Sequence, residues 1–338
     1  MPQAVDRKIP AGGENELDGK KRNEAHAAGT ENGVLRLLGR KIAPLGEIIE
    51  AYPISEGGSA DRKYKVHFYG YDGAYLLRLF DGFSFDLRRA EFEALHRMQA
   101  MTVHCSRPIA FGQWKSDGLF FLLLSYIEGT DAERILPLTP KPQQLRIGMQ
   151  AGEELSRIGC CAVPEPAEAW AARHRRRIER AEAVLQAGGV WGASAEVASA
   201  KLRADSGLAE GRPESFLHGS FGPANLIVHT GRLVGVIGFE RFGWGDPVYE
   251  FARLGLHSRS LSPLFCTGQI LGYHGGQAPD DLFWRLYALY AASGVLSQLA
   301  DTLEQRPETF GETLQMADRL LLDHDGFASD RPSWFAAL

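Results

Sequence analysis

The sequence has no excess of positive charge. Its 37 lysine and arginine residues are outnumbered by 42 aspartate and glutamate residues, which gives a formal net charge of -5 at pH 7. Proteins that bind nucleic acids generally present a basic surface to the phosphate backbone. The charge balance therefore argues against a nucleic acid as the partner.

Cysteine is scarce and is not grouped. The four cysteines, Cys105, Cys160, Cys161 and Cys266, form no CxxC pair and no spacing that is typical of a zinc site. Such a pattern fits reduced thiols in a reducing compartment. We therefore expect a cytoplasmic protein without a structural metal.

Long apolar runs are also missing. None reaches the roughly 20 residues that a membrane-spanning helix requires. The first residues, MPQAVDRKIPAGGENELDGKK, lack the basic stretch and apolar core of a secretion signal. We expect neither membrane insertion nor secretion. What the chain does have is 44% hydrophobic residues over 338 positions, which is enough for a large core.

The residue pattern changes along the chain and predicts its organisation. Residues 1–32 contain almost no large apolar side chains, which predicts a flexible arm. Residues 33–127 are rich in short strand patterns, residues 128–330 in long helical patterns, and residues 331–338 form a tail. This order predicts an α+β protein with a β-rich N-lobe and a mainly helical C-lobe.

Individual elements follow from the spacing of apolar residues. Val34–Ile49 (VLRLLGRKIAPLGEII) has helical spacing broken at Gly39 and Pro44, which predicts an interrupted helix packed on the outside. Between Ala51 and Tyr126 the order reads strand, glycine turn, strand, strand, helix, strand. Four later segments predict helices, interrupted by a strand-rich stretch over Asn225–Phe239: Gln144–Gly159, Ala169–Gln186, Asp281–Leu303 and Gly311–Phe327.

The segment Phe216–Leu254 carries the most specific motif. It reads FLHGSFGPANLIVHTGRLVGVIGFERFGWGDPVYEFARL and resembles the aminoglycoside-phosphotransferase and choline-kinase-like families, whose pattern is H-G-D-x-x-x-x-N, two strands, I-D-F and a G-D-P turn. His218 and Asn225 match residue by residue. The resemblance implies a protein-kinase-like two-lobed fold, with ATP or another nucleotide as the ligand.

Two positions depart from that pattern. The family's catalytic aspartate is replaced by Ser220, next to His218, and its metal-binding aspartate by Gly238. Serine is no carboxylate base and glycine has no side chain, whereas Mg²⁺ prefers anionic oxygen ligands. The resemblance implies that Asn225 remains as a metal ligand. Glu240 is a candidate substitute, because it would share a face with Gly238 if the strand stayed extended.

Other observations leave alternatives open. The resemblance implies histidines where the chain has Gly222 and Gly159, while a misaligned or deliberately substituted sequence would explain all these departures differently. Asp246 in the G-D-P turn either caps a helix or binds metal. The run Arg173–Arg180 is either a solvated helix face or a docking face for an acidic peptide.

The nucleotide-binding residues are expected in the N-lobe and at its end. Small residues in the loop, Gly57, Gly58 and Ser59, would let the backbone approach a phosphate, although an ordinary hairpin turn has the same composition. Arg78 lies in an apolar strand and is expected to meet phosphates or a helix carboxylate. Glu91 is the candidate partner, with Glu93 as the alternative. Ser125 and Ile127 would offer backbone groups to an adenine edge.

The combination predicts a kinase-fold pseudoenzyme. We expect a nucleotide- or peptide-binding regulatory subunit with a protein, peptide or small-molecule partner. The resemblance implies a bacterial natural-product biosynthetic complex as its setting. The rival is an active ATP-dependent phosphotransferase of the aminoglycoside type, with Glu240 and Asn225 holding the metal. A structural partner with a collapsed cleft is the third hypothesis.

Overall fold

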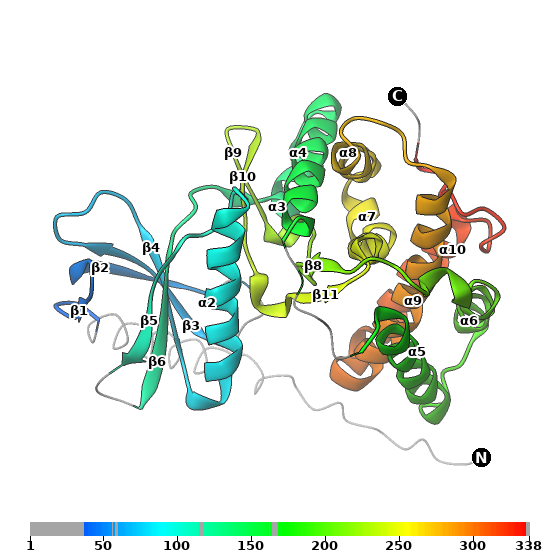
Figure 1. Ribbon diagram of the computed structural model, residues 1–338, viewed down its shortest axis with the longest axis horizontal. Coiled ribbons are helices and arrows are strands. Elements are labelled where there is room, and N and C mark those ends of the chain that lie inside the picture. The colour runs from blue at the N-terminus through cyan, green and yellow to red at the C-terminus, as the bar shows by residue number, and fades with distance from the viewer. Residues whose placement is uncertain are drawn as a thin grey trace, which may run out of the picture. The chain divides into compact units, whose positions relative to one another are not determined.

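The computed structural model describes residues 37–55, 57, 60–114, 118–161, 163 and 168–335. The chain divides into two compact units, drawn in Figure 1. The first contains the residues up to Phe85 together with Ile109–Tyr126, and the second contains Asp86–Pro108 and the residues from Ile127 onward. The arm expected over residues 1–32 lies outside the described residues. No helix of the described ranges is long and apolar enough to cross a membrane.

The first unit is a six-stranded sheet in the order β1-β2-β3-β4-β6-β5. Its pairs β1–β2, β2–β3, β3–β4 and β4–β6 are antiparallel. The strands are β1 (Lys41–Ile42), β2 (Gly46–Ile54), β3 (Arg62–Phe68), β4 (Tyr75–Phe80), β5 (Pro108–Trp114) and β6 (Leu119–Ser125). The strands β2, β3, β4 and β6 were expected from the sequence, whereas β5 was not.

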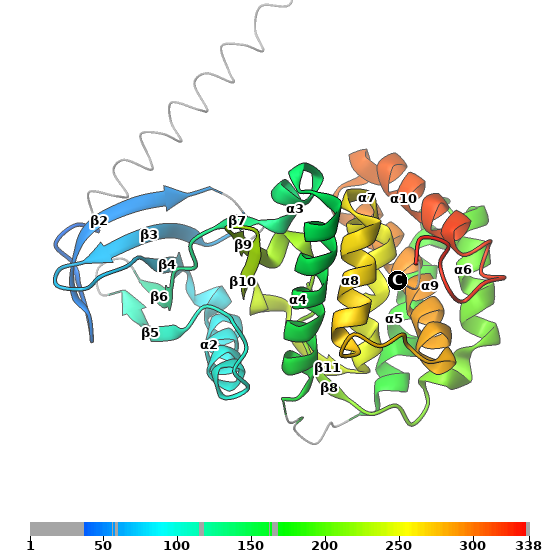
Figure 2. The same cartoon turned by 90° about the horizontal axis from the view of Figure 1, so that it is seen from above.

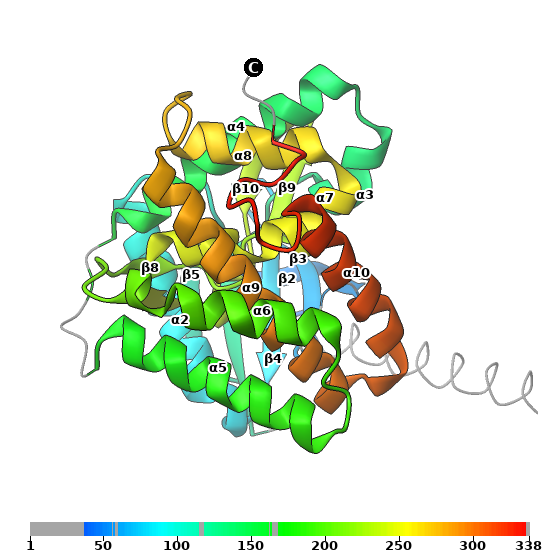
Figure 3. The same ribbon diagram turned by 90° about the vertical axis from the view of Figure 1, so that its right-hand side faces the viewer.

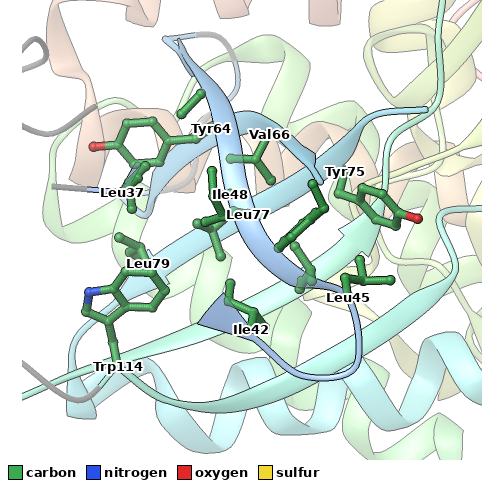
Figure 4. Close-up of a cluster of buried hydrophobic side chains, with 13 residues drawn as sticks. Leu37, Ile42, Leu45, Ile48, Tyr64, Val66, Tyr75, Leu77, Leu79 and Trp114 are labelled. Carbon is green, nitrogen blue, oxygen red and sulfur yellow. The ribbon is translucent and has the colours of Figure 1, made fainter. Parts of the chain in front are cut away.

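One face of this sheet forms an apolar core (Figure 4). Alternate residues of β3, namely Tyr64, Val66 and Phe68, are buried there, as the two-residue period of a strand requires. Leu77 and Leu79 of β4 join the same cluster. Burial of this apolar face stabilises the unit at about 25 cal/mol per Å² of apolar area removed from water.

The helix expected over Val34–Ile49 is wrong for the described part of that segment. Residues 37–39 form a turn, followed by β1 and the start of β2. Ile42, Leu45 and Ile48 are all buried in the sheet core. Their spacing of three residues imitates a helical face, but Gly39 and Pro44 favour turns on either side of β1, so the segment pairs as edge strands.

The second unit is mainly helical. Its helices are α2 (Phe85–Ala100, whose first residue belongs to the first unit), α3 (Ala132–Ile135), α4 (Lys141–Gly159), α5 (Trp170–Ala187), α6 (Ala193–Ala204), α7 (Arg259–Leu261), α8 (Pro263–Tyr273), α9 (Asp281–Gln305) and α10 (Phe310–Asp323). The four helices expected after Glu128 are confirmed as α4, α5, α9 and α10. The alanine-rich α6 was not anticipated.

Helix α9 is the central element of this unit. It packs against α5, α6 and α10 (Figure 3). Most of its residues are buried on every side, among them Tyr287 and Tyr290. A helix that is apolar all round is expected to lie inside a protein and not on its surface.

Helices α4 and α8 lie side by side along their length (Figure 2). Glycines face each other across the contact. A Cβ atom added at Gly148 would lie 2.2 Å from the carbonyl oxygen of Phe265, and one at Gly272 would lie 2.0 Å from that of Met149. The two backbones can approach this closely only because these positions carry no side chain.

Two small sheets complete the second unit. Strands β7 (Thr130–Asp131), β9 (Leu226–His229) and β10 (Arg232–Val236) form one sheet in the order β10-β9-β7. Strands β8 (Ser215–Leu217) and β11 (Gly243–Gly245) pair as the other. The strand-rich stretch expected over Asn225–Phe239 is thereby confirmed. The loop that bears the family motif lies between β8 and β9.

Candidate functional site

His218 anchors the motif loop and is completely buried. Its Nε2 donates a hydrogen bond to the carbonyl oxygen of Ile237 over 2.9 Å, and its Nδ1 accepts one from the backbone N–H of Ser220 over 3.2 Å. Burial lowers its pKa to about 4, so the ring is neutral at pH 7. Both ring nitrogens are occupied by the backbone, which assigns His218 a positioning role in the loop.

Glu250 holds the same loop from the other side. Its carboxylate accepts a hydrogen bond of 2.7 Å from the backbone N–H of Gly219, and the N–H of Phe221 also donates to it. Burial raises its pKa to about 7, against the opposing effect of these N–H donors. No local pattern could have predicted this role, because Glu250 lies 31 residues after Gly219.

Asp246 of the G-D-P turn is fully buried and fully hydrogen-bonded. Its carboxylate accepts from Arg212 Nε over 2.6 Å, from the hydroxyl of Tyr290 over 2.9 Å and from the backbone N–H of Val248 over 3.0 Å. The last bond caps the 3₁₀ helix Pro247–Arg253. The capping interpretation of Asp246 is confirmed, and its oxygens are occupied.

Gly238 adopts a left-handed conformation, with φ 80° and ψ 41°. A Cβ atom at this position would lie 2.5 Å from Oδ1 of Asn225. The Asn225 side chain is held there by a hydrogen bond of 2.9 Å from its Nδ2 to the carbonyl oxygen of Ser220. The amide of Asn225 thus occupies the space in which a side chain at position 238 would begin.

The chain does not stay extended from Gly238 to Glu240, so the condition for Glu240 to share a face with position 238 is not met. Strand β10 ends at Val236, and Phe239–Arg241 forms a 3₁₀ turn after the left-handed glycine. The carboxylate of Glu240 lies 3.4 Å from Nη1 of Arg88, which also donates to Glu91 over 3.0 Å. Left-handed geometry at Gly238 therefore turns Glu240 towards an arginine of α2.

The donors gathered around the loop fit Mg²⁺ poorly. They are the neutral amide of Asn225, the hydroxyl of Ser220 and the carboxylate of Glu240, which already pairs with Arg88. Within the described ranges no group of three histidine, cysteine, aspartate or glutamate side chains could hold a metal ion. Mg²⁺ requires several oxygen ligands, preferably anionic, so these contacts argue against a metal site at Asn225 and Glu240. The metal-binding role of these two residues is not tested and stays a prediction.

The expected nucleotide residues are distributed over both units, and Gly58 and Ser59 lie outside the described residues. In the first unit, Arg78 donates from Nε to Asp61 Oδ2 over 2.8 Å, so Asp61 is an acidic partner that the sequence did not suggest. Gly57 has φ 88°, and its carbonyl accepts from Lys63 over 3.4 Å. Ser125 ends β6, opposite Tyr75.

The remaining nucleotide candidates belong to the second unit. Glu91 lies on α2, buried against Arg88. The side chain of Ile127 lies against Gly235 of β10, where an added Cβ atom would approach it within 2.5 Å. The roles of all these residues in nucleotide binding stay predictions.

A pocket of about 380 Å³ opens beside the motif loop, entirely within the second unit. Gly219 and Glu250 of the loop framework form part of its wall, and aromatic side chains such as Trp244 and Tyr249 form another part. Arg177, Arg241 and Arg253 also line it. The sequence singled out only the run that contains Arg177, because the other arginines are isolated in the chain.

One unit contains a six-stranded sheet, and the helical unit carries the H-G-x loop, a hairpin and the G-D-P turn. Together these features define a kinase-like phosphotransferase class. The chain belongs to the phosphotransferase enzyme family, whose model matches residues 51–287. No curated protein matches the sequence significantly.

Solved structures of aminoglycoside phosphotransferases share this fold. A complex of a thermostable mutant of APH(4)-Ia with ADP and hygromycin B has 17% identity and a TM-score of 0.61, and the match covers 84% of this chain and 96% of that one. Spectinomycin phosphotransferase APH(9)-Ia, with ADP and spectinomycin, has 12% identity, a TM-score of 0.57 and coverages of 84% and 94%. ADP-bound APH(2'')-Ib has 16% identity, a TM-score of 0.57 and coverages of 80% and 93%.

Proposed function

We propose that the chain is a phosphotransferase-fold protein that binds its ligands without transferring phosphate. The observation that carries this proposal is the geometry at Gly238, where the side chain of Asn225 fills the space of the missing aspartate. Phosphoryl transfer needs a placed metal and a group that orients the acceptor hydroxyl. At positions 220 and 238 the loop supplies a hydroxyl and a hydrogen atom instead.

Nucleotide binding without transfer is part of the same proposal. Related structures contain ADP or a non-hydrolysable ATP analogue, and the loop framework of His218, Asp246 and Glu250 is intact here. A protein of this kind would act through what it binds, as a binding or regulatory subunit. A setting in natural-product biosynthesis stays a prediction.

The direct test is incubation with Mg-ATP and a panel of hydroxyl acceptors, while ADP is measured by a coupled assay. We expect no sustained ADP formation above that of a blank, and a thermal shift with ATP that is the same with and without Mg²⁺. Sustained turnover that disappears in Glu240→Ala would overturn the proposal in favour of the active phosphotransferase. Absence of a shift with any nucleotide would contradict the nucleotide-binding part.

A gain-of-function variant sharpens this test. Ser220→Asp with Gly238→Asp restores the family's carboxylates, but the new side chain at 238 must displace Asn225 and adopt a left-handed backbone. We therefore expect the double variant to stay inactive. Activity in the double variant would show that the side chain of Asn225 moves aside easily.

A further inference from the structure

The arginines of α5 and of the pocket fall into two groups. On α5, Arg175 pairs with Glu210 and Arg180 with Glu304, each over 2.8 Å, and Arg176 pairs with Glu168. Arg173, at the edge of the pocket, pairs with Glu214. The chain thus provides a carboxylate for each arginine of this group.

The second group, Arg177, Arg241 and Arg253, lines the pocket and has no such partner among the described residues. Arg177 donates only to the neutral hydroxyl of Tyr249, over 2.8 Å. Nη2 of Arg253 lies 3.4 Å from Nε2 of His257, whose pKa burial lowers to about 4, so that ring is uncharged at pH 7. The side chain of Arg241 forms neither a hydrogen bond nor an ion pair with the described residues.

The carboxylates at the pocket do not cancel these charges. The carboxylate of Glu250 faces the N–H groups of the loop. Burial raises its pKa to about 7, so it is only partly ionised at pH 7. Asp301 is exposed to solvent at the pocket. Desolvation and the charge of Arg241 lower the pKa of Arg253 and outweigh the opposing effect of Tyr249, Glu250 and Asp301.

The rest of the pocket fits a partly apolar ligand. Trp244, Tyr249 and Leu256 provide apolar surface, and the volume of about 380 Å³ is within the range of small-molecule sites. The hydroxyl of Ser297 also belongs to the lining; it is buried and has no hydrogen-bond partner within the described residues. A buried polar group without a partner is uncommon in native proteins and would gain from a bound acceptor or donor.

We infer that this pocket binds a small anion, a carboxylate or phosphate attached to an aromatic or apolar group. Arg177, Arg241 and Arg253 would pair with the anion, and the aromatic wall would hold the apolar part. The inference rests on the proposed function in that the pocket holds the ligand that the protein binds. It disfavours a polycationic aminoglycoside, because the unpaired guanidinium groups would repel ammonium groups.

Four ligands that share one ring isolate the effect of charge. Phenyl phosphate and phenylacetate are anions, benzyl alcohol is neutral and benzylamine is a cation. Isothermal titration of the full chain should show binding of the two anions that weakens with added salt, with benzyl alcohol at least about tenfold weaker and benzylamine not binding. Stronger phenyl phosphate than phenylacetate binding would identify a phosphate as the preferred anion, and the reverse order a carboxylate.

Variants assign the binding to the pocket. We expect Arg241→Gln and Arg253→Gln each to weaken anion binding about tenfold, whereas Arg175→Gln, which removes an ion-paired arginine of α5, leaves it unchanged. Thermal unfolding of each variant checks that it folds, since neither Arg241 nor Arg253 forms an ion pair within the described residues. Equal loss in all three variants, tighter binding of hygromycin B than of the anions, or no anion binding at millimolar concentration would each overturn the inference.

Failure of this inference is distinguishable from failure of the proposed function. The titrations contain no nucleotide, so they report on the pocket alone. Sustained ADP formation with Mg-ATP would overturn the proposed function and leave an anion-selective pocket standing. Absence of anion binding with absence of turnover would do the reverse.

Discussion

Two sets of residues around the motif loop of the second unit differ sharply: the loop framework of His218, Asp246 and Glu250, and positions 220 and 238, where the family has its catalytic and metal-binding aspartates. His218, Asp246 and Glu250 are buried and bonded to neighbouring backbone or side-chain groups. Ser220 lies on the motif loop and Gly238 follows the end of β10, and neither residue carries a charge. The framework side chains form hydrogen bonds with backbone groups, and none of them occupies a position that reacts in the family. The shape of this site therefore does not depend on carboxylates at positions 220 and 238.

The largest expected effect is at Asp246. Asp246→Ala removes a buried carboxylate that Arg212, Tyr290 and Val248 all contact, so the guanidinium of Arg212 is left without its partner. We expect the free energy of unfolding to fall by about 3–5 kcal/mol. Urea denaturation measures it, with Glu210→Gln on the exposed Arg175 pair as the control at about 1 kcal/mol or less. Similar losses in both would mean that Asp246 is not central to the framework.

A smaller effect is expected at the loop glycines. Gly219 has φ 76°, and a Cβ atom there would lie 2.0 Å from the carbonyl oxygen of Arg241, whereas Gly222 is extended and has open space around it. Gly219→Ala should destabilise the protein by about 3 kcal/mol and Gly222→Ala by less than about 1 kcal/mol. Thermal unfolding of the pair checks this. Equal melting temperatures would show that the loop is not held as described.

The smallest effect is the pH dependence due to Glu250. Its pKa is raised from 4.5 to about 7 in the folded protein, so the folded state holds the proton more tightly than the unfolded state. The resulting stability is present below pH 4.5 and is lost as pH rises through 7. Between pH 4.5 and 8 the unfolding free energy of the native protein should fall by about 2–3 kcal/mol relative to Glu250→Gln. A constant difference would contradict the raised pKa.

The sequence was most informative where residue identity and spacing coincide. The H-G-x loop, the hairpin after it and the G-D-P turn were assigned from one segment, and the cap at Asp246 followed from local chemistry. The apolar periods of α4, α5, α9 and α10 were long enough to distinguish helix from strand. The spacing of Ile42, Leu45 and Ile48 fitted a helix equally well, and only pairing with β2 and β3 decides for strands.

The rest depends on contacts between residues far apart in the chain. The pair of Arg78 with Asp61 joins β4 to the loop before β3, and the pair of Glu240 with Arg88 spans 152 residues. The turn at Gly238 depends on Asn225, whose side chain fills the adjacent space. The pocket arginines come from separate segments, so no local pattern could have brought Arg241 and Arg253 together.

The glycine contact between α4 and α8 has a mechanical consequence. Side chains that interdigitate can change rotamer and let two helices slide, whereas carbonyl groups that touch bare Cα atoms leave no such adjustment. The two helices must shift as one rigid piece or separate. Helix α4 also contacts the hairpin next to the motif loop. Its Gln143 and Gln150 side chains form hydrogen bonds with the backbone of Gly231 and Leu233. The close glycine contact therefore couples α8 to the hairpin through α4, and a displacement of α8 would also displace the hairpin.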